Sequence, residues 1–195
     1  MKRLVKNLYY FLGRFFFKAR FRKLIRKLGR HTEVYLVDID NTLAHTWPSL
    51  QQRHYSAENK RYRSLPIFIG MRSYLLEKMH QGQPLIFLSA RSYLNYRVTC
   101  QWLSGNGLPG RNVILVADPQ EKLEYITELL CRGLKVVYID DLSHGHEFGN
   151  VNLYEDLILD LKALPVAYLG IKEISLINSD DKIDNQSVKA TVPCP

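Results

Sequence analysis

The sequence of this 195-residue chain predicts an α/β fold, in which a central parallel sheet carries helices on both faces. Short apolar runs, typical of buried strands, alternate along the chain with longer segments that have the spacing of helices. Several of these runs end directly in polar residues, and the carboxyl ends of parallel strands are where such sheets carry their sites. The length and the hydrophobic share of 46% suit one domain with its own core.

Five strands are expected, each a short apolar run bounded by polar or turn residues. They cover residues 34–37, 85–88, 113–116, 136–139 and 166–169. Helices are expected over residues 67–81, 94–103, 121–130 and 152–164. Glycines follow the first three of these helices, as is common at helix ends. Residues 45–66 are polar, aromatic and basic, and predict a small irregular insertion or flap that is too short for a full cap domain.

Basic residues are concentrated at the N-terminus. Of the 27 lysines and arginines, 11 precede His31, and no acidic residue occurs among them. The other 16 stand against all 19 acidic residues, so the net charge of +8 belongs to residues 1–30. The chain thus divides into a basic arm (1–30), an α/β domain (31–178) and a polar tail (179–195) that we expect to be frayed and disordered.

The arm has two apolar stripes at helical spacing, taken at about 100° per residue. The first comprises Leu4, Val5, Leu8, Phe11, Leu12, Phe15 and Phe16, and the second comprises Phe17, Phe21, Leu24, Ile25 and Leu28. The stripes differ by roughly half a turn, which predicts two basic amphipathic helices with a break between residues 17 and 20. An anionic membrane surface fits such helices, the domain itself is an equal alternative, and nucleic acid is a third candidate partner.

Composition also bears on location. No stretch reaches the roughly 18 consecutive apolar residues of a membrane span. The three cysteines are odd in number and far apart, which predicts free thiols and a reducing compartment. We therefore expect a cytoplasmic protein, peripheral at a membrane if the arm binds one. A mitochondrial presequence is the alternative reading of an Arg-rich, acid-free arm.

Two carboxylates follow the first predicted strand. Asp38 and Asp40 come directly after it, and Thr42 follows them. Carboxylates this close repel each other unless a cation lies between them. A divalent cation removes that conflict and screens the approach of a nucleophile to a phosphate.

Other strand ends carry complementary groups. Ser89 and Arg91 follow the second strand, and a hydroxyl and a guanidinium can both bind phosphate oxygens. Asp140 and Asp141 follow the fourth strand and suit the oxygen shell of Mg²⁺. Lys122, near the start of the preceding helix, is placed to neutralise a phosphate and a carboxylate.

Two neighbouring features leave alternatives open. Lys135 competes with Lys122 as the lysine of the site. His144 and His146 follow the second acidic pair without a convincing ligand spacing, so loop or substrate contacts are expected rather than metal ligation.

Asp38-Ile39-Asp40-Asn41-Thr42, Ser89, Lys122 and Asp140-Asp141 resemble, in this order, the four motifs of the haloacid dehalogenase (HAD) superfamily. The resemblance covers residues 33–169 and implies a three-layer, Rossmann-like (Rossmannoid) fold with a minimal cap, preceded by the basic helices. It implies a phosphatase in which Asp38 is the nucleophile that forms an aspartyl-phosphate and Asp40 is the general acid/base. The same resemblance implies that Mg²⁺ is held by Asp38, the backbone carbonyl of Asp40, and Asp141, with Asp140 in support. It places Thr42, Ser89, Arg91 and Lys122 on the phosphate.

The substrate is less defined. Thr99, Trp102 and Leu103 add a fainter resemblance to the phosphatase domain of polynucleotide kinase/phosphatases, although ordinary helix packing explains them as well. The small insertion predicts an open site and a large or surface-bound phosphorylated substrate, such as a glycan, a lipid or a nucleic-acid end. The alternative function is a non-catalytic HAD-like module that binds a membrane or nucleic acid through the arm.

Overall fold

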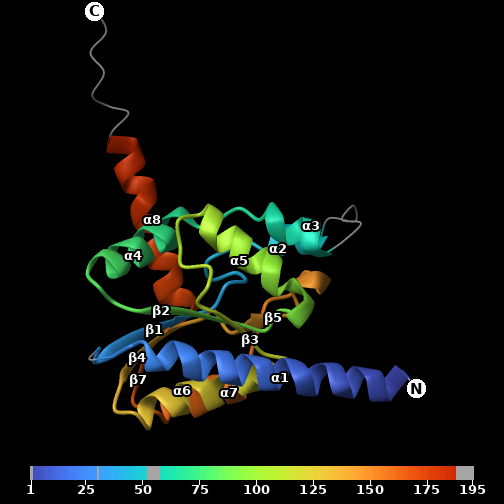
Figure 1. The fold of residues 1–195 in the computed structure, drawn as a ribbon. Helices are drawn as coiled ribbons and strands as arrows, with labels where there is room; N and C mark the ends of the chain where they lie inside the picture. Colours follow the sequence, from blue (N-terminus) through green and yellow to red (C-terminus); the bar gives the residue numbers. More distant parts are fainter. Residues whose placement is uncertain (1, 30, 52–57, 188–195) are drawn as a thin grey trace, which may run out of the picture.

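A five-stranded parallel sheet forms the centre of the protein (Figure 1). The computed structural model describes residues 2–29, 31–51 and 58–187. The strands lie in the order β3-β2-β1-β4-β7. They are β1 (Glu33–Val37), β2 (Leu85–Ser89), β3 (Val113–Leu115), β4 (Lys135–Ile139) and β7 (Val166–Leu169). All five predicted strands are confirmed, each within one residue of its expected bounds.

Helices cover both faces of this sheet (Figure 1). One face carries α1 (Lys2–Arg26), α6 (Lys122–Leu130) and α7 (Glu155–Lys162), and the other carries α4 (Ile69–His80), α5 (Tyr96–Gly105) and α8 (Ile171–Ser187). Short 3₁₀ turns are η1 (Tyr93–Asn95), η2 (Pro119–Glu121) and η3 (His146–Phe148). The predicted three-layer α/β fold is therefore confirmed. Across the described residues, we find no helix with the length and apolar character to cross a bilayer.

The three inner strands, β1, β2 and β4, are buried on both faces, which explains why their sequences are uninterrupted apolar runs. Val37, at the end of β1, is in register with Phe87 of β2 and with Ile139 of β4. The residues that follow these three strands therefore meet at one edge of the sheet, which we call the carboxyl edge.

Four predicted segments differ from the structure, and the insertion and the helix expected from residue 152 are the first two. The insertion is not irregular, because it contains α2 (Trp47–Gln51) and α3 (Glu58–Arg63); residues 52–57 lie outside the described part. The helix expected from residue 152 begins at Glu155, since β6 (Asn152–Leu153) pairs antiparallel with β5 (Ser143–His144).

The predicted frayed tail is wrong up to Ser187, where α8 ends, and residues 188–195 lie outside the description. Helix α8 forms because its first half packs on α4, which the polar sequence after residue 179 does not reveal. The Asn178 side chain accepts a hydrogen bond from the backbone N–H of Met71 at 2.9 Å. At the crossing, a Cβ on Gly70 would lie 2.3 Å from the backbone oxygen of Ile177, so the two helices approach as closely as glycine permits.

The arm is one continuous helix, so the predicted break between residues 17 and 20 is wrong. The two stripes do not need a common surface, because only the second one packs on the domain. Phe17, Phe21 and Ile25 are buried, and the Phe21 ring meets Tyr125 of α6 edge to face at 4.8 Å. The expectation that one stripe packs on the domain is thus confirmed for the second stripe.

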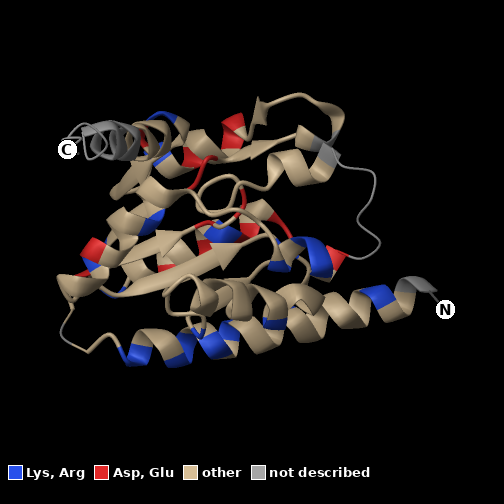
Figure 2. Cartoon of the chain, turned by 90° about the horizontal axis from the view of Figure 1, so that it is seen from above, with Lys and Arg blue, Asp and Glu red and all other residues tan. Residues whose placement is uncertain are grey.

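Ion pairs fasten the polar side of α1 to η2 and α6. Arg14 pairs with Glu121, Lys18 with Glu124 at 2.6 Å, and Arg22 with Glu128 at 4.0 Å. Figure 2 shows the basic residues along α1 and no acidic ones. Residues 14–25 of the predicted arm are therefore packed against the domain.

Two of the three cysteines, Cys100 and Cys131, lie in the described part, and both are free thiols as expected.

Candidate active site

Three charged side chains meet at the carboxyl edge of the sheet. Asp38 follows β1 directly, and its backbone N–H donates to the carbonyl of Ile139 at 2.8 Å, which fixes it beside β4. The ammonium of Lys122, the first residue of α6, lies 2.7 Å from Asp38 Oδ1 and 2.6 Å from Asp140 Oδ2. All three side chains are buried. Lys135 is exposed at the far end of β4, so Lys122 is the lysine of the site.

A third carboxylate completes an acidic cluster. Oxygens of Asp38, Asp140 and Asp141 all lie within 4.8 Å of one another. Burial raises the pKa of Asp38 well above its ordinary value, even though the charge of Lys122 opposes this. Burial and the charge of Asp140 raise the pKa of Asp141 to about 7. One ammonium does not balance three carboxylates, so a hard divalent cation with oxygen ligands fits the cluster.

Hydrogen bonds hold the cluster in place. The hydroxyl of Ser143 donates to Asp141, and that of Tyr138 donates to Asp140. The backbone N–H of Leu142 donates to Asp140 Oδ1 at 2.9 Å. These bonds leave the carboxylates little freedom, which is the preorganisation that a metal site or a reacting group needs.

Thr42 supports the cluster as well. Its hydroxyl donates to Asp141 Oδ1 at 3.2 Å and accepts from the Asp141 backbone N–H at 3.0 Å. A hydroxyl has one proton to donate, so none remains for a phosphate oxygen. Thr42 is predicted to bind phosphate, and in this structure its hydroxyl pairs with Asp141.

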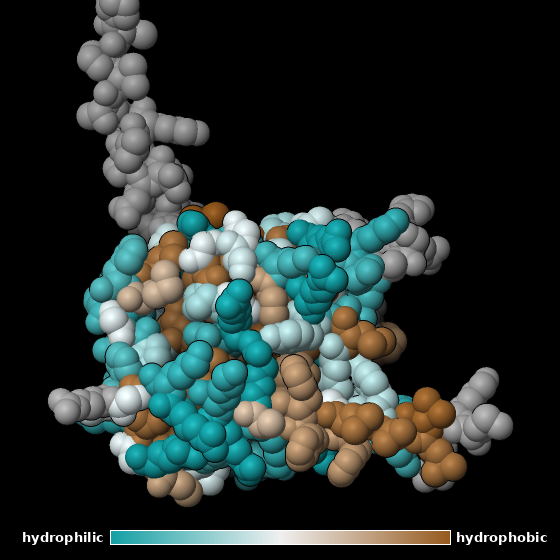
Figure 3. All heavy atoms as spheres, in the orientation of Figure 1, coloured by the Kyte–Doolittle hydropathy of each residue, from teal (hydrophilic) through white to brown (hydrophobic). Residues whose placement is uncertain are grey.

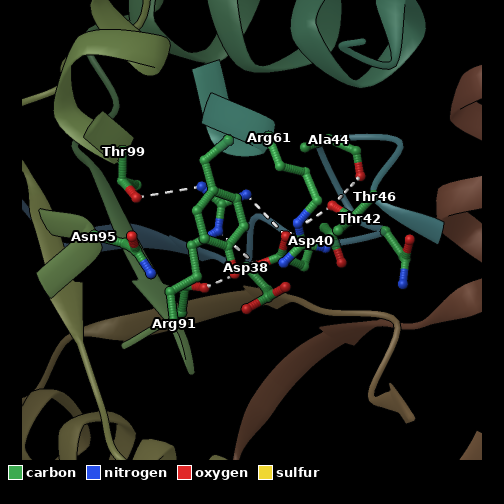
Figure 4. A network of polar contacts seen from close by, with 12 residues as sticks. Asp38, Asp40, Thr42, Ala44, Thr46, Arg61, Arg91, Asn95 and Thr99 are labelled. Atoms are coloured by element: carbon green, nitrogen blue, oxygen red, sulfur yellow. Dashed lines mark hydrogen bonds and ion pairs between the residues drawn. The ribbon is translucent and has the colours of Figure 1, made fainter. Parts of the chain in front are cut away.

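Asp40 has its own partners beside the cluster (Figure 4). Arg91 donates to both of its oxygens, at 2.7 and 2.8 Å, and the hydroxyl of Thr46 donates at 2.7 Å. Burial acts to raise the pKa of Asp40, but the charge and hydrogen bonds of Arg91 outweigh burial and hold it below its ordinary value. Asp40 is therefore a carboxylate in this structure. Ser89, also predicted in the site, lies with its hydroxyl 3.4 Å from Asp40.

Arg91 is enclosed from several sides. Its Nη1 donates to the hydroxyl of Thr99 at 3.2 Å, and its guanidinium lies 4.1 Å from the ring centroid of Tyr62. Only 1% of its side chain is exposed. Arg91 was predicted to contact phosphate, and in this structure it faces Asp40.

The insertion brings a second guanidinium to Asp40. Arg61 of α3 is buried, its charge adds to the lowering of the Asp40 pKa, and its Nη1 has no hydrogen-bond partner among the described residues (Figure 4). Glu58 fastens α3 to η1 by accepting from Asn95 at 2.7 Å, and Trp102 donates to the Leu65 carbonyl at 2.9 Å. Trp102 therefore packs in the ordinary way, under the insertion.

Sequence reasoning missed several of these residues. Thr46, Tyr138 and Ser143 contact the site, but each lies outside a recognisable motif. The signal for Ser143 was its place two residues after the second acidic pair. The acidic cluster among the described residues consists of Asp38, Asp140 and Asp141, and the expectation for His144 and His146 stays a prediction. His146 Nε2 lies 2.6 Å from the Ser143 hydroxyl.

Two cavities open beside these residues. The smaller, of about 170 Å³, is lined by Asp38, Asp40, Ser89 and Lys122 together with the second acidic pair. The larger, of about 630 Å³, lies between α2, α4 and α8 and has mostly apolar walls, including Trp47, Phe68 and Ile174. Asn41, Asp141 and Ser143 line both, so the two cavities are neighbours.

The sheet order and the acidic cluster at its carboxyl edge define a HAD-like fold. Two solved structures of the class C acid phosphatase from Bacillus anthracis are similar to this chain. The one with tungstate bound is 17% identical, with a TM-score of 0.51 over 85% of this chain and 76% of that chain. The other is 15% identical, with a TM-score of 0.50 over 96% of this chain and 91% of that chain.

At this level of identity the likeness establishes the fold alone. No protein-family model matches the sequence, and no curated protein matches it.

Proposed function

We propose that this protein is a Mg²⁺-dependent phosphomonoesterase that works through an aspartyl-phosphate on Asp38. The observation that carries the proposal is the buried cluster of Asp38, Asp140 and Asp141 bridged by Lys122 at the carboxyl edge of a HAD-like sheet. The similarity to class C acid phosphatases supports the same reaction class. Tungstate, bound in one of those structures, is an oxyanion like phosphate.

In the first step, a carboxylate oxygen of Asp38 attacks phosphorus, and the bond from phosphorus to the leaving oxygen breaks. Lys122 is fixed 2.7 Å from Asp38, where its charge also stabilises the phosphoryl oxygens. Ser89 lines the same cavity and offers a hydroxyl donor.

Asp40 moves the protons. As a carboxylate it is ready to take a proton from the water that hydrolyses the aspartyl-phosphate. To protonate the leaving oxygen first, it must itself bind a proton. An arriving phosphate favours this, because its negative charge raises the pKa of a nearby carboxyl and competes for Arg91. Arg61, with an unpartnered buried nitrogen, is a second group for that anion.

The cation would be held by Asp38 and Asp141, with the Asp40 carbonyl and with Asp140 in support. It supplies positive charge that offsets the repulsion between an anionic nucleophile and an anionic ester. The surplus of carboxylates over ammonium groups and the raised pKa of Asp141 support such a site.

The substrate we propose is large or surface-bound: a phosphorylated glycan, a lipid or a nucleic-acid end. The described residues of the insertion form two short helices, and the insertion as a whole is too short for a full cap domain over the carboxyl edge. The neighbouring cavity of about 630 Å³ has room for a bulky, largely apolar leaving group.

The test is hydrolysis of an aryl phosphate by the full chain, with Mg²⁺ and with a chelator. We expect turnover with Mg²⁺ only, and its loss in Asp38→Asn. Asp160→Asn, the same substitution at an exposed position of α7, is the matched control and should keep full activity. Equal activity in Asp38→Asn would overturn the assignment of the nucleophile. A chain that hydrolyses none of a panel of phosphomonoesters but binds a membrane or nucleic acid would support the non-catalytic module instead.

A further inference from the structure

The first apolar stripe of α1 is largely exposed in the described structure, although the Phe16 ring at its end meets Tyr96 of α5 edge to face at 6.1 Å. Its large side chains are half to three-quarters exposed; for example, Phe11 is 68% and Phe15 is 70% exposed. We call Leu4, Leu8, Phe11, Leu12, Phe15 and Phe16 the outer stripe. Figure 3 shows a continuous apolar surface along this part of the helix. A run of this size on one helix face marks an interaction site, because scattered single apolar residues are the rule elsewhere on protein surfaces.

The same half of α1 is fixed beside the candidate active site. The Tyr9 hydroxyl lies 3.1 Å from Ser92 Oγ and accepts a hydrogen bond from the Leu94 backbone N–H at 3.2 Å. Both partners belong to the segment that directly follows Arg91. Gly13 allows this approach, since a Cβ there would lie 2.0 Å from the Tyr93 ring. In Figure 1 the N-terminal end of α1 extends past the carboxyl edge of the sheet.

Further apolar side chains are exposed on the loops of that edge. Leu94, on η1, is 82% exposed, and Phe148, on η3, is 79% exposed. These loops follow β2 and β4 and also carry Arg91 and Asp141. Exposed apolar side chains on separate loops around one site are typical of a protein surface that binds an apolar partner.

Charge favours an anionic lipid surface over the other occupants. No acidic residue occurs before Glu33, so the charged residues that share this half of α1 with the outer stripe are all cations, among them Lys6. Lys6 has no acidic partner among the described residues; its ammonium lies 5.9 Å from the ring of Tyr10. Anionic headgroups attract such cations while acyl chains accept the apolar face.

Nucleic acid is less favoured, because the cations further along α1 already pair with α6 and the surface left free is apolar. A second copy of the chain is less favoured, because no acidic residue precedes Glu33 and two such helices would bring like charges, among them Lys6, together.

We infer that the outer stripe docks on an anionic bilayer and that the carboxyl edge of the sheet then faces the lipid headgroups. The docking stands by itself. Its consequence for substrate rests on the proposed function: the site would act on phosphomonoesters presented at a membrane surface. The larger cavity, with its apolar walls, suits the apolar part of such a substrate.

The test is sedimentation of the full chain with vesicles of phosphatidylcholine alone and with phosphatidylglycerol added. We expect binding to the anionic vesicles, weakened by salt, and a loss of at least about tenfold in Leu8→Ser/Phe11→Ser. Leu159→Ser/Leu176→Ser removes two equally exposed apolar side chains from α7 and α8, and should bind like the unmodified chain. Both double variants should hydrolyse a soluble aryl phosphate normally.

The readouts separate this inference from the proposed function, because sedimentation needs no turnover and is also done on Asp38→Asn. No binding to anionic vesicles overturns the inference, as does equal binding by the Leu8/Phe11 variant. A dimer that Leu8→Ser/Phe11→Ser dissolves would assign the stripe to a second copy. The chain could instead bind an oligonucleotide more tightly than it binds anionic vesicles. If that binding is strongly salt-dependent and unchanged in Leu8→Ser/Phe11→Ser, it would assign the N-terminal cations to nucleic acid.

Discussion

Lys122 is the residue whose replacement tests the electrostatics of the site most sharply. Lys122→Met removes the ammonium that lies 2.7 Å from Asp38 and 2.6 Å from Asp140, and its side chain is only 5% exposed. Removing one partner of a buried ion pair costs about 3–5 kcal/mol. Both carboxylates can take up a proton once the ammonium is gone, so we expect the lower end, about 3 kcal/mol. For a chain of this size this lowers Tm by roughly 6–12 °C.

The assay is thermal unfolding followed by circular dichroism at neutral pH, with a chelator and with excess Mg²⁺. Mg²⁺ should recover part of the loss in Lys122→Met, because the cation replaces the missing positive charge. A ligand at one hundred times its Kd stabilises the folded state by about 2.7 kcal/mol. Lys135→Met is the matched control: the same substitution at the exposed start of β4 should shift stability by no more than about 0.5 kcal/mol.

Two results would refute this reasoning. If Lys122→Met and Lys135→Met unfold at the same temperature in chelator, the buried ion bridge contributes nothing measurable to folding. If Mg²⁺ leaves the Tm of both Lys122→Met and the unmodified chain unchanged, no cation shares these carboxylates.

Three further predictions concern the helix–domain contacts and pH. Phe21→Ala should lower the free energy of unfolding by about 3–5 kcal/mol in denaturant titrations. Phe11→Ala, on the exposed side of α1, should change it by less than about 0.5 kcal/mol. Equal effects of the two substitutions would contradict the packing of α1 on the domain. Gly70→Ala should destabilise by about 1–3 kcal/mol, because the added Cβ meets the backbone of α8 and one of the two helices must shift; a stabilised variant would disprove that contact. In chelator, the free energy of unfolding should fall by up to roughly 4 kcal/mol as the pH rises from 4 to 7. The reason is that the pKa of Asp141 is about 7 in the folded protein, against an ordinary 3.8, so between these pH values the folded protein binds a proton that the unfolded chain releases. Mg²⁺ should flatten this slope, and a stability that rises with pH in chelator would show that Asp141 is not raised.

The sheet was predictable because its strands are buried on both faces. Such strands must be apolar throughout, so β1, β2 and β4 stand out as short apolar runs in the sequence. The site followed from the strands, since parallel order alone brings the residues after them to one edge. Asp38, Lys122 and Asp140 meet there as expected.

What sequence reasoning could not supply were partners set by tertiary contact. Whether a stripe on α1 faces the domain depends on α6, far along the chain. The half-turn offset between the stripes predicts a break, but it reflects two different environments on one continuous helix. Likewise, Thr42 lies in a recognisable motif, but which oxygen its hydroxyl bonds depends on Asp141, 99 residues away. The pairing of Arg91 with Asp40 depends in the same way on the insertion that covers it.

The central claim is that Asp38 carries the phosphoryl group in a cation-dependent reaction. Its most direct test is acid quenching of the full chain during turnover of an aryl phosphate with Mg²⁺, followed by mass spectrometry of the peptides. The account predicts one added phosphoryl group on the peptide that contains Asp38, absent with chelator and absent in Asp38→Asn. A phosphoryl group on another residue, or one that persists in Asp38→Asn, would contradict it.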